Sequence, residues 1–246
     1  MKLSEAVKHP PKIILAGNPG SGKTALALTL GEGTTVIDLD DGLLTGMTLK
    51  DAFFERRQQV EVKPCKEDNP NKALAFAKAM SYVRGMSDEC LKGKPPCRGL
   101  VIDSLTTLAE GAMRYVMSNN GMLGQHPQIQ HWGLRDLELQ NFFLTVYSLP
   151  MVVVLIVHLQ TVQEEGDVRA AVGPDGRMKM ELITKTKFKI ALPGKAYPPK
   201  LPPRFDELWL AEQEEGQEAR WSTRCIRWER SRLRPGLEAT CPLSRI

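Results

Sequence analysis

An eight-residue stretch near the amino terminus constrains the fold more than any other feature of this chain. Residues 17–24 read Gly-Asn-Pro-Gly-Ser-Gly-Lys-Thr and complete the pattern G-x-x-x-x-G-K-[ST]. The apolar residues 12–16 directly before it predict a buried strand, and residues 24–30 suit a helix. A glycine-rich loop of this pattern between a strand and a helix indicates a phosphate-binding loop.

The residue types in the loop match the chemistry of a bound nucleoside triphosphate. Glycines let backbone N–H groups approach phosphate oxygens closely. We expect Lys23 to reach the β- and γ-phosphates and the hydroxyl of Thr24 to bind Mg²⁺. The sequence therefore predicts ATP and Mg²⁺ as ligands, and a nucleotide site made of Gly17, Asn18, Pro19, Gly20, Ser21, Gly22, Lys23, Thr24 and Ala25.

Composition sets the broad class of the protein. The 246 residues, of which 42% are hydrophobic, fit one α/β domain, which we favour, as well as two small domains. A formal charge of +4 permits an anionic partner without demanding one. Five scattered cysteines without a C-x-x-C pair indicate a reduced, intracellular setting. The longest apolar run, 151–157, is too short to span a bilayer, so we expect a soluble, cytoplasmic protein without a membrane partner.

Apolar runs alternate with amphipathic segments along most of the chain. Further strands are expected at 34–42, 60–63, 99–104 and 151–157, and helices at 71–84, 105–118 and 132–148, with a loop over 86–98. Residues 160–204 are rich in Gly, Pro and Lys and predict a long loop or an extended hairpin, followed by edge strands at 206–211 and 219–228. This order predicts a mostly parallel central sheet flanked by helices, in a single domain over 1–235 with a tail at 236–246.

Acidic and polar residues follow the strands that should neighbour the loop. Asp103 ends an apolar strand and is the candidate for binding Mg²⁺ through a water molecule. Asp38, Asp40 and Asp41 end the strand before it, and we favour Asp40 as a carboxylate beside the γ-phosphate, with a solvated acidic turn as the alternative. His158 ends the 151–157 strand, where it could sense the γ-phosphate or serve the structure alone.

At this point the chain resembles a known family. The loop, the acid-tipped residues 36–40, the segment 101–108 and the polar tip 157–160 follow the order and character of the RecA-type recombinase core. More narrowly, a helix led by Trp132, the Leu149-Pro150 pair, His158 and residues 205–207 look like the compact phage RecA-like ATPases of single-strand annealing and recombination. The resemblance covers residues 10 to 235.

The resemblance implies a role for each site residue. Lys23 and Thr24 would contact phosphate and Mg²⁺, Asp103 would contact a metal-bound water, and Asp40 would stand where RecA-like proteins place a catalytic Glu. His158 would stand where they place a Gln that senses the γ-phosphate. Asp is one methylene shorter than Glu, so slow turnover is expected.

The resemblance also implies a nucleic-acid surface and a subunit interface. In RecA-like proteins the segment after the sensor strand lies on single-stranded DNA, and cations there would give sequence-independent, salt-sensitive binding. A solvated hairpin whose lysines only maintain solubility is the alternative. Carboxyl-terminal arginines could act on the nucleotide of a neighbouring subunit, contact DNA or simply carry surface charge. The candidates are Arg169, Arg177, Lys179, Lys185, Lys187 and Lys189 for DNA, and Arg230 and Arg232 as arginine fingers.

Together these features predict a DNA-stimulated ATPase of phage-type recombination or strand annealing. It would act in the cytoplasm, that of the host if the chain is phage-encoded, as a homo-oligomer and with a single-strand-binding protein as a further partner. Three alternatives stay open: a nucleotide-gated DNA-binding module with negligible turnover, a helicase or packaging motor, and a small-molecule kinase.

Overall fold

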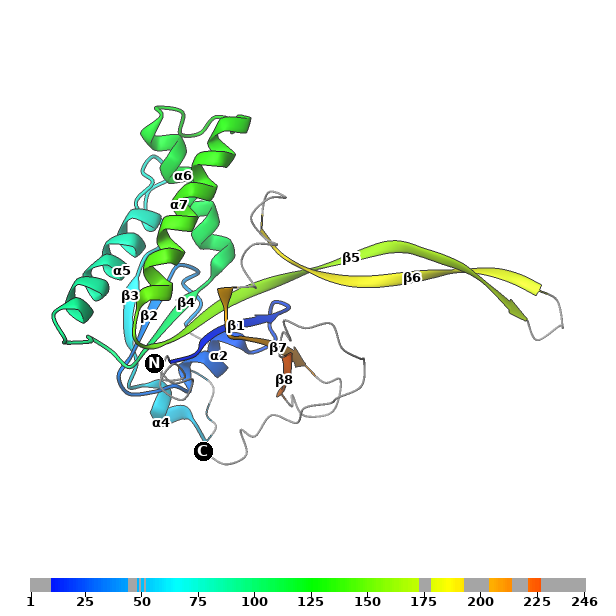
Figure 1. Ribbon diagram of the computed structural model, residues 1–246, viewed down its shortest axis with the longest axis horizontal. Helices are drawn as coiled ribbons and strands as arrows, with labels where there is room; N and C mark the ends of the chain where they lie inside the picture. The colour runs from blue at the N-terminus through cyan, green and yellow to red at the C-terminus, as the bar shows by residue number, and fades with distance from the viewer. Residues whose placement is uncertain are drawn as a thin grey trace, which may run out of the picture.

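The computed structural model describes residues 10–43, 48, 50, 52–172, 178–192, 204–213 and 221–226; for 161–172, 178–188, 212–213 and 221–226 it describes the backbone alone. A twisted sheet forms its centre, in the strand order β3-β2-β4-β5-β1-β7-β8 (Figure 1). The strands are β1 (Lys12–Gly17), β2 (Thr34–Asp38), β3 (Glu61–Pro64), β4 (Gly99–Asp103), β5 (Val152–Val172), β6 (Met178–Ile190), β7 (Glu207–Gln213) and β8 (Trp221–Ile226).

Pairing within the sheet is parallel except at one edge and in the β5–β6 hairpin. β1 pairs with β5 and β7, and β4 pairs with β2 and β5, all in parallel, while β8 runs antiparallel to β7. The predicted mostly parallel sheet with carboxyl-terminal edge strands is therefore confirmed. One strand, β5, lies between the strand of the phosphate loop and the strand that ends at Asp103.

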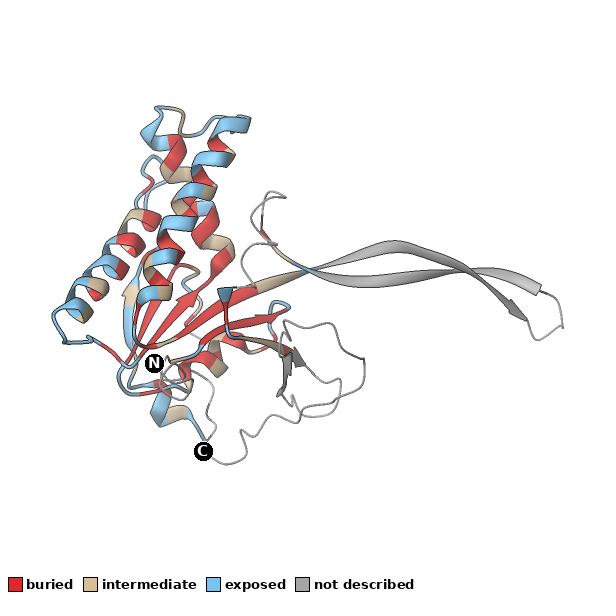
Figure 2. Cartoon of the chain, in the orientation of Figure 1, coloured by how far each residue is buried: buried red, intermediate tan, exposed pale blue. Residues whose placement is uncertain are grey.

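Helices cover both faces of this sheet. α5 (Ala75–Leu91), α6 (Leu105–Asn119) and α7 (Ile129–Ser148) pack together on one face, and α2 (Lys23–Leu28) lies on the other face, near α4 (Phe54–Arg57) (Figure 1). Alternate residues of β1 enter two separate apolar clusters: Ile14 joins the one with α5 to α7, and Ile13 joins the one with α2. Figure 2 shows the resulting buried stripe along the central strands. Burial on both faces explains why these strands are apolar throughout instead of alternating with polar residues.

Several element boundaries differ from the sequence-based expectation: α5 begins at Ala75 instead of residue 71, β2 ends at Asp38 instead of residue 42, and no helix was expected at α4. α5 runs on to Leu91, where a loop was predicted from residue 86, because Val83 and Met86 continue its buried stripe and Cys90 packs against the same cluster. α7 begins three residues before the expected start at Trp132, where the side chain of Gln128 and that of His131 form a capping box. None of the helices within the described ranges is long and apolar enough to cross a membrane.

β5 extends far beyond the apolar stretch that predicted it. From Leu159 onward it pairs antiparallel with β6, in a register that runs from Leu159–Ile190 to Val172–Met178 with one irregularity between Glu165 and Val168. Figure 1 shows this hairpin leaving the sheet and projecting away from the body of the molecule. Within the segment 160–204, for which loop and hairpin were both open, residues 160–172 and 178–190 thus lie in the two paired strands of a hairpin.

Candidate nucleotide-binding site

The phosphate loop and the predicted acidic and histidine residues meet at the carboxyl edge of the sheet. In the strand register Gly17 lies beside His158 on one side and Ala211 on the other, and Asp38 lies beside Asp103. Parallel strands end at the same edge, which is where ligands bind in such sheets. The loop after β1 therefore faces the tips of β2, β4 and β5.

Glycines shape the loop for different reasons. Gly20 and Gly22 have φ angles of 79° and 78°, a left-handed conformation that residues with a side chain rarely adopt. Gly17 has no room for a side chain, because a Cβ there would lie 2.5 Å from the carbonyl oxygen of Ala211 and 2.5 Å from Oγ of Ser21. Close packing of β7 against the first residue of the loop thus requires glycine.

Lys23 is buried at the start of α2. Its side chain is 4% exposed, and Nζ donates a hydrogen bond to the carbonyl oxygen of Asn18 at 2.7 Å. Burial lowers the pKa of this ammonium, opposed by the nearby charges of Asp103 and Asp40. A phosphate oxygen would compete with the Asn18 carbonyl for this ammonium. Its negative charge would stabilise the protonated form of Lys23, which burial destabilises.

Thr24 and Asp103 are in direct contact. Oγ1 of Thr24 donates to Oδ2 of Asp103 at 2.7 Å, and Asp103 is only 2% exposed. Burial raises the pKa of Asp103 to about 6, despite the Thr24 hydrogen bond that lowers it. A hydroxyl and a carboxylate are oxygen ligands of the kind that Mg²⁺ takes from proteins, with waters and phosphates filling its other positions. No group of three or more His, Cys, Asp or Glu that could hold a metal occurs among the described residues.

The three acids after β2 have different surroundings. Asp38 is buried and its Oδ1 accepts a hydrogen bond from the backbone N–H of Asp41 at 3.0 Å, so it holds the turn. Asp41 has a positive φ of 57° and forms a surface ion pair with Lys66 at 2.9 Å. Asp40 alone turns toward the tip of β5, which separates it from the other two.

Asp40 lies in a small polar network. Oδ2 is 3.3 Å from Nε2 of His158, and Oδ1 accepts a hydrogen bond from the hydroxyl of Thr107 in the first turn of α6. Burial would raise the pKa of Asp40, but the hydrogen bonds from His158 and Thr107 outweigh it and lower the pKa below its ordinary value. Asp40 is therefore an ionised carboxylate beside the loop, fixed by two neighbours.

Within the described part of the chain, the buried polar atoms at this edge that have no hydrogen-bond partner include Oγ of Ser21, in the loop, and Nδ1 of His158, at the tip of β5. Buried polar atoms are almost always hydrogen-bonded in folded proteins. Unpaired polar atoms beside the loop fit a surface that is completed by a polar ligand such as a nucleotide.

A family model described as an AAA domain matches residues 9–220, which is most of the chain. The chain belongs to this AAA domain family. None of the curated proteins matches it. A solved structure described as a prototypical ATPase from the type III secretion system of pathogenic bacteria resembles it with a TM-score of 0.47 and 11% sequence identity, over 83% of this chain and 52% of that one. The AAA domain chain thus spans about half the length of that ATPase.

The AAA domain family and the loop together make this chain a P-loop NTPase.

Sequence reasoning assigned no role to two threonines of its site. Thr107 donates to Asp40, and Thr106 donates to the carbonyl oxygen of Ala191 at 2.9 Å. The N–H of Ala191 in turn donates to the carbonyl oxygen of His158 at 2.9 Å. The first turn of α6 therefore touches both the acid of the site and the base of the hairpin. The two adjacent hydroxyl residues that follow the strand ending at Asp103 were the sequence signal that could have indicated this role.

The predicted DNA-binding cations of the AAA domain are partly described. Lys185, Lys187 and Lys189 occupy alternate positions of β6, and Lys189 is exposed. Arg169 and Lys179 lie farther out along the hairpin, and Arg169 is paired with Glu181 in the register. Arg177, Arg230 and Arg232 lie outside the described residues.

Proposed function

We propose that this P-loop domain hydrolyses ATP and binds single-stranded DNA through its β5–β6 hairpin, in recombination or strand annealing of the phage type. One observation carries the proposal: β5 bears His158 beside the phosphate loop and continues without interruption into the hairpin. A single strand thus links the proposed nucleotide site to the proposed DNA surface.

The nucleotide half of the proposal assigns each residue a task. Lys23 would hold the phosphates, while Thr24 and Asp103 would hold Mg²⁺, which neutralises charge on the phosphate oxygens when bound. Asp40 would orient the attacking water and accept its proton, and His158 would keep Asp40 in place. The contact of Thr24 with Asp103 and that of Asp40 with His158 support these assignments. Phosphoryl transfer depends mainly on such positioning and charge stabilisation.

The DNA half rests on the lysines of β6. Lys185, Lys187 and Lys189 are two residues apart, so they occupy the same face of the strand at intervals of about 7 Å. A row of positive charge along an extended ribbon suits the phosphates of an extended single strand. Binding of this kind is independent of sequence and weakens as salt rises.

Assembly and setting complete the proposal. We include a homo-oligomer in which Arg230 or Arg232 reaches the nucleotide of a neighbouring subunit, a single-strand-binding protein as a partner, and a cytoplasmic location. The resemblance to RecA-like proteins is the support for these points.

The decisive experiment is phosphate release measured during a titration of single-stranded DNA at two salt concentrations. We expect DNA to stimulate the wild type, and Lys23→Ala to lose hydrolysis at every DNA concentration. Replacing Lys185, Lys187 and Lys189 together by Gln should weaken DNA binding and reduce its salt slope by about 2, from a loss of about 0.7 per phosphate contact. ATP binding without DNA should not change.

A matched variant controls for charge alone. Lys63, Lys72 and Lys92 are described lysines outside the hairpin, and their triple change to Gln removes the same charge. Equal DNA affinity in both triple variants and the wild type would refute the hairpin assignment. It would leave the nucleotide assignment standing.

A nucleotide-gated DNA-binding module with negligible turnover is the second candidate. Asp40 favours it, because its two oxygens already engage Thr107 and His158 and Asp is short for a catalytic base. Steady-state phosphate release decides: binding of ATP and DNA without sustained release would establish the module in place of the ATPase.

A further inference from the structure

A cavity of about 330 Å³ lies at the amino edge of the sheet, opposite to the edge that holds the phosphate loop. Three of the residues that line it form one row across neighbouring strands: Thr34 of β2 pairs with Gly99 of β4, which pairs with Val152 of β5. Along β4, the distance from Gly99 to Asp103 is about 13 Å. A ligand in this cavity would therefore be separate from a nucleotide at the loop.

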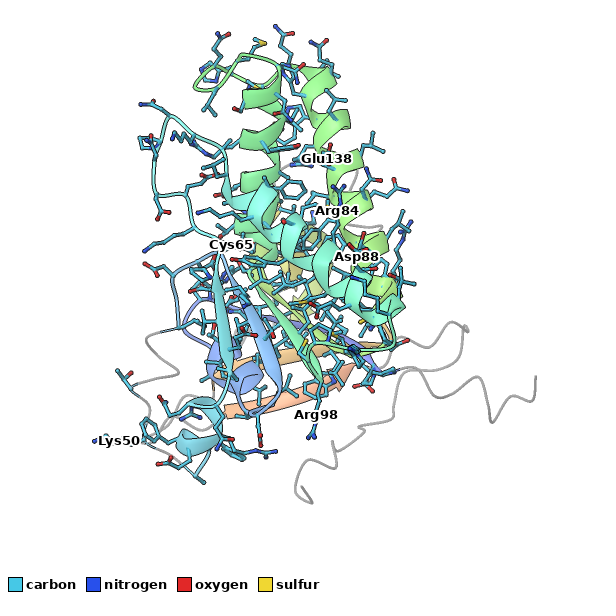
Figure 3. All side chains as sticks on the ribbon, turned by 90° about the vertical axis from the view of Figure 1, so that its left-hand side faces the viewer. Lys50, Cys65, Arg84, Asp88, Arg98 and Glu138 are labelled. Carbon is cyan, nitrogen blue, oxygen red and sulfur yellow. The ribbon has the colours of Figure 1, made fainter. Side chains whose placement is uncertain are left out.

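Figure 3 shows the two edges of the sheet. Arg98, directly before β4, is labelled at the lower end of the strands, and Cys65, directly after β3, is labelled at their upper end. Because β2 pairs in parallel with both of these strands, the two labels mark the amino edge and the carboxyl edge. Arg98 is one of the residues that line the cavity.

A second arginine, Arg56 of α4, lines the same cavity, and both arginines are exposed. Their side chains lie against the turn between α2 and β2. A Cβ on Gly31 would be 3.4 Å from Cβ of Arg56. A Cβ on Gly33 would be 3.3 Å from Cγ and Cδ of Arg98. One turn thus supports the stems of two arginines that come from different segments of the chain.

Neither guanidinium group has a hydrogen bond or an ion pair within the part of the chain that the structure describes. This is so although the carboxylate of Glu32 and the amide of Gln59 line the same cavity. A guanidinium carries five N–H donors in a planar fork that matches the oxygens of carboxylates and phosphates. Two such groups in one cavity, both without an anionic partner there, indicate a site for an anion.

We propose that this cavity binds a small phosphate monoester, with its phosphate group held by Arg56 and Arg98. A phosphate monoester carries a charge of about −1.5 to −2 at neutral pH and has three terminal oxygens, which suits two guanidinium groups. A single carboxylate offers one charge and two oxygens. The cavity volume is at the lower end of the range of small-molecule sites, about 300 to 1,000 Å³.

The other lining residues suit the rest of such a ligand. Glu32 and Gln59 can pair with hydroxyl groups, and Leu30 and Val152 can contact carbon atoms. A phosphorylated sugar combines a phosphate, hydroxyl groups and a carbon skeleton. We therefore choose glucose 6-phosphate as the probe of the site.

Calorimetric titration with glucose 6-phosphate, without nucleotide or Mg²⁺, tests the proposal. Arg56→Gln and Arg98→Gln should each weaken binding at least about tenfold, because each removes charged hydrogen bonds to the phosphate. Arg84→Gln is the matched control, since it removes the same charge from an exposed position of α5, and it should bind like the wild type. If Lys23→Ala alone loses binding, the ligand belongs to the phosphate loop and the proposal is wrong.

Glu32→Gln should change affinity in the opposite direction. It removes a negative charge from the cavity, so glucose 6-phosphate should bind several-fold more tightly than to the wild type. A folding defect would not strengthen binding, so this variant decides the matter if the arginine variants melt earlier than the wild type.

Two further ligands identify the chemistry of the site. Succinate, which carries two carboxylates, should bind more weakly than glucose 6-phosphate, and so should inorganic phosphate, which has no carbon atoms to contact Leu30 and Val152. Equal or tighter binding of either one overturns the assignment to a phosphate monoester, as does an Arg98→Gln variant that binds like the wild type. The proposed ATPase and DNA activities use other residues and would stand in each case.

Discussion

The hydroxyl of Thr24 donates a hydrogen bond to Oδ2 of Asp103 at 2.7 Å, which joins the phosphate loop to a strand that is not its neighbour in the sheet. Asp103 is almost fully buried there, and burial raises its pKa to about 6. A carboxylate in this position is held in an unfavourable environment until a cation arrives. Two consequences can be measured, one for stability and one for metal-dependent binding.

Asp103→Asn should stabilise the metal-free protein at neutral pH. The folded pKa of about 6 exceeds the ordinary value of 3.8, so the folded state binds the proton more tightly and loses stability as pH rises from 4 through 6. Asn stays neutral and can still accept from Thr24. We expect a gain of about 1 to 3 kcal/mol at pH 8 and none at pH 4, measured by urea unfolding. Asp88→Asn, at an exposed site, should show no such gain at either pH.

Nucleotide binding in the presence of Mg²⁺ should weaken in acid. Protonated Asp103 cannot serve a divalent cation, so affinity should fall about tenfold per pH unit below a pH of about 6. The phosphates of the nucleotide also titrate in this range, and therefore the Asp103→Asn variant is the comparison. Calorimetric titration should show a steeper loss in the wild type than in the variant, and parallel curves would contradict the assignment.

Local patterns were sufficient to predict most of the fold and the places of the phosphate loop and Asp103 within it. The strands β1 and β4, with the loop and Asp103 at their carboxyl ends, were readable because both faces of these strands are buried and their apolar runs are continuous. The end of α5 was not predicted. Met86 and Cys90 have helical spacing and lie on the buried side of the helix, but the polar residues around them led to the prediction of a loop.

Long-range partners could not be derived from the sequence. Asp40 and His158 are 118 residues apart, and their contact depends on which strand lies between β1 and β4. The register of the hairpin likewise depends on how β5 and β6 align. The alternation along β6 places Lys185 and Met180 on opposite faces of the strand, whereas composition alone indicates only a basic segment.

Asp40→Asn should lower kcat for ATP hydrolysis at least about 100-fold with little change in nucleotide affinity. Asparagine cannot accept a proton from water, and general-base contributions are of this size. Hydrogen bonds keep the pKa of Asp40 below its ordinary value, so the acidic limb of the pH–rate profile should belong to Asp103. Asp41→Asn, which loses only a surface ion pair with Lys66, should retain activity. Equal kcat values for the two variants would remove Asp40 from the mechanism.

Gly17→Ala should destabilise the protein by several kcal/mol, because a Cβ would lie 2.5 Å from both the carbonyl oxygen of Ala211 and Oγ of Ser21. Neither the strand β7 nor the loop can yield without breaking the packing at the site. Gly85→Ala is the matched control: it lies inside α5 with nothing within 4 Å of a new Cβ, and alanine should stabilise that helix by about 0.5 to 1 kcal/mol. The midpoint temperatures of thermal unfolding of the two variants should therefore shift in opposite directions from that of the wild type. A Gly17→Ala protein as stable as the wild type would show that β7 does not pack against the loop.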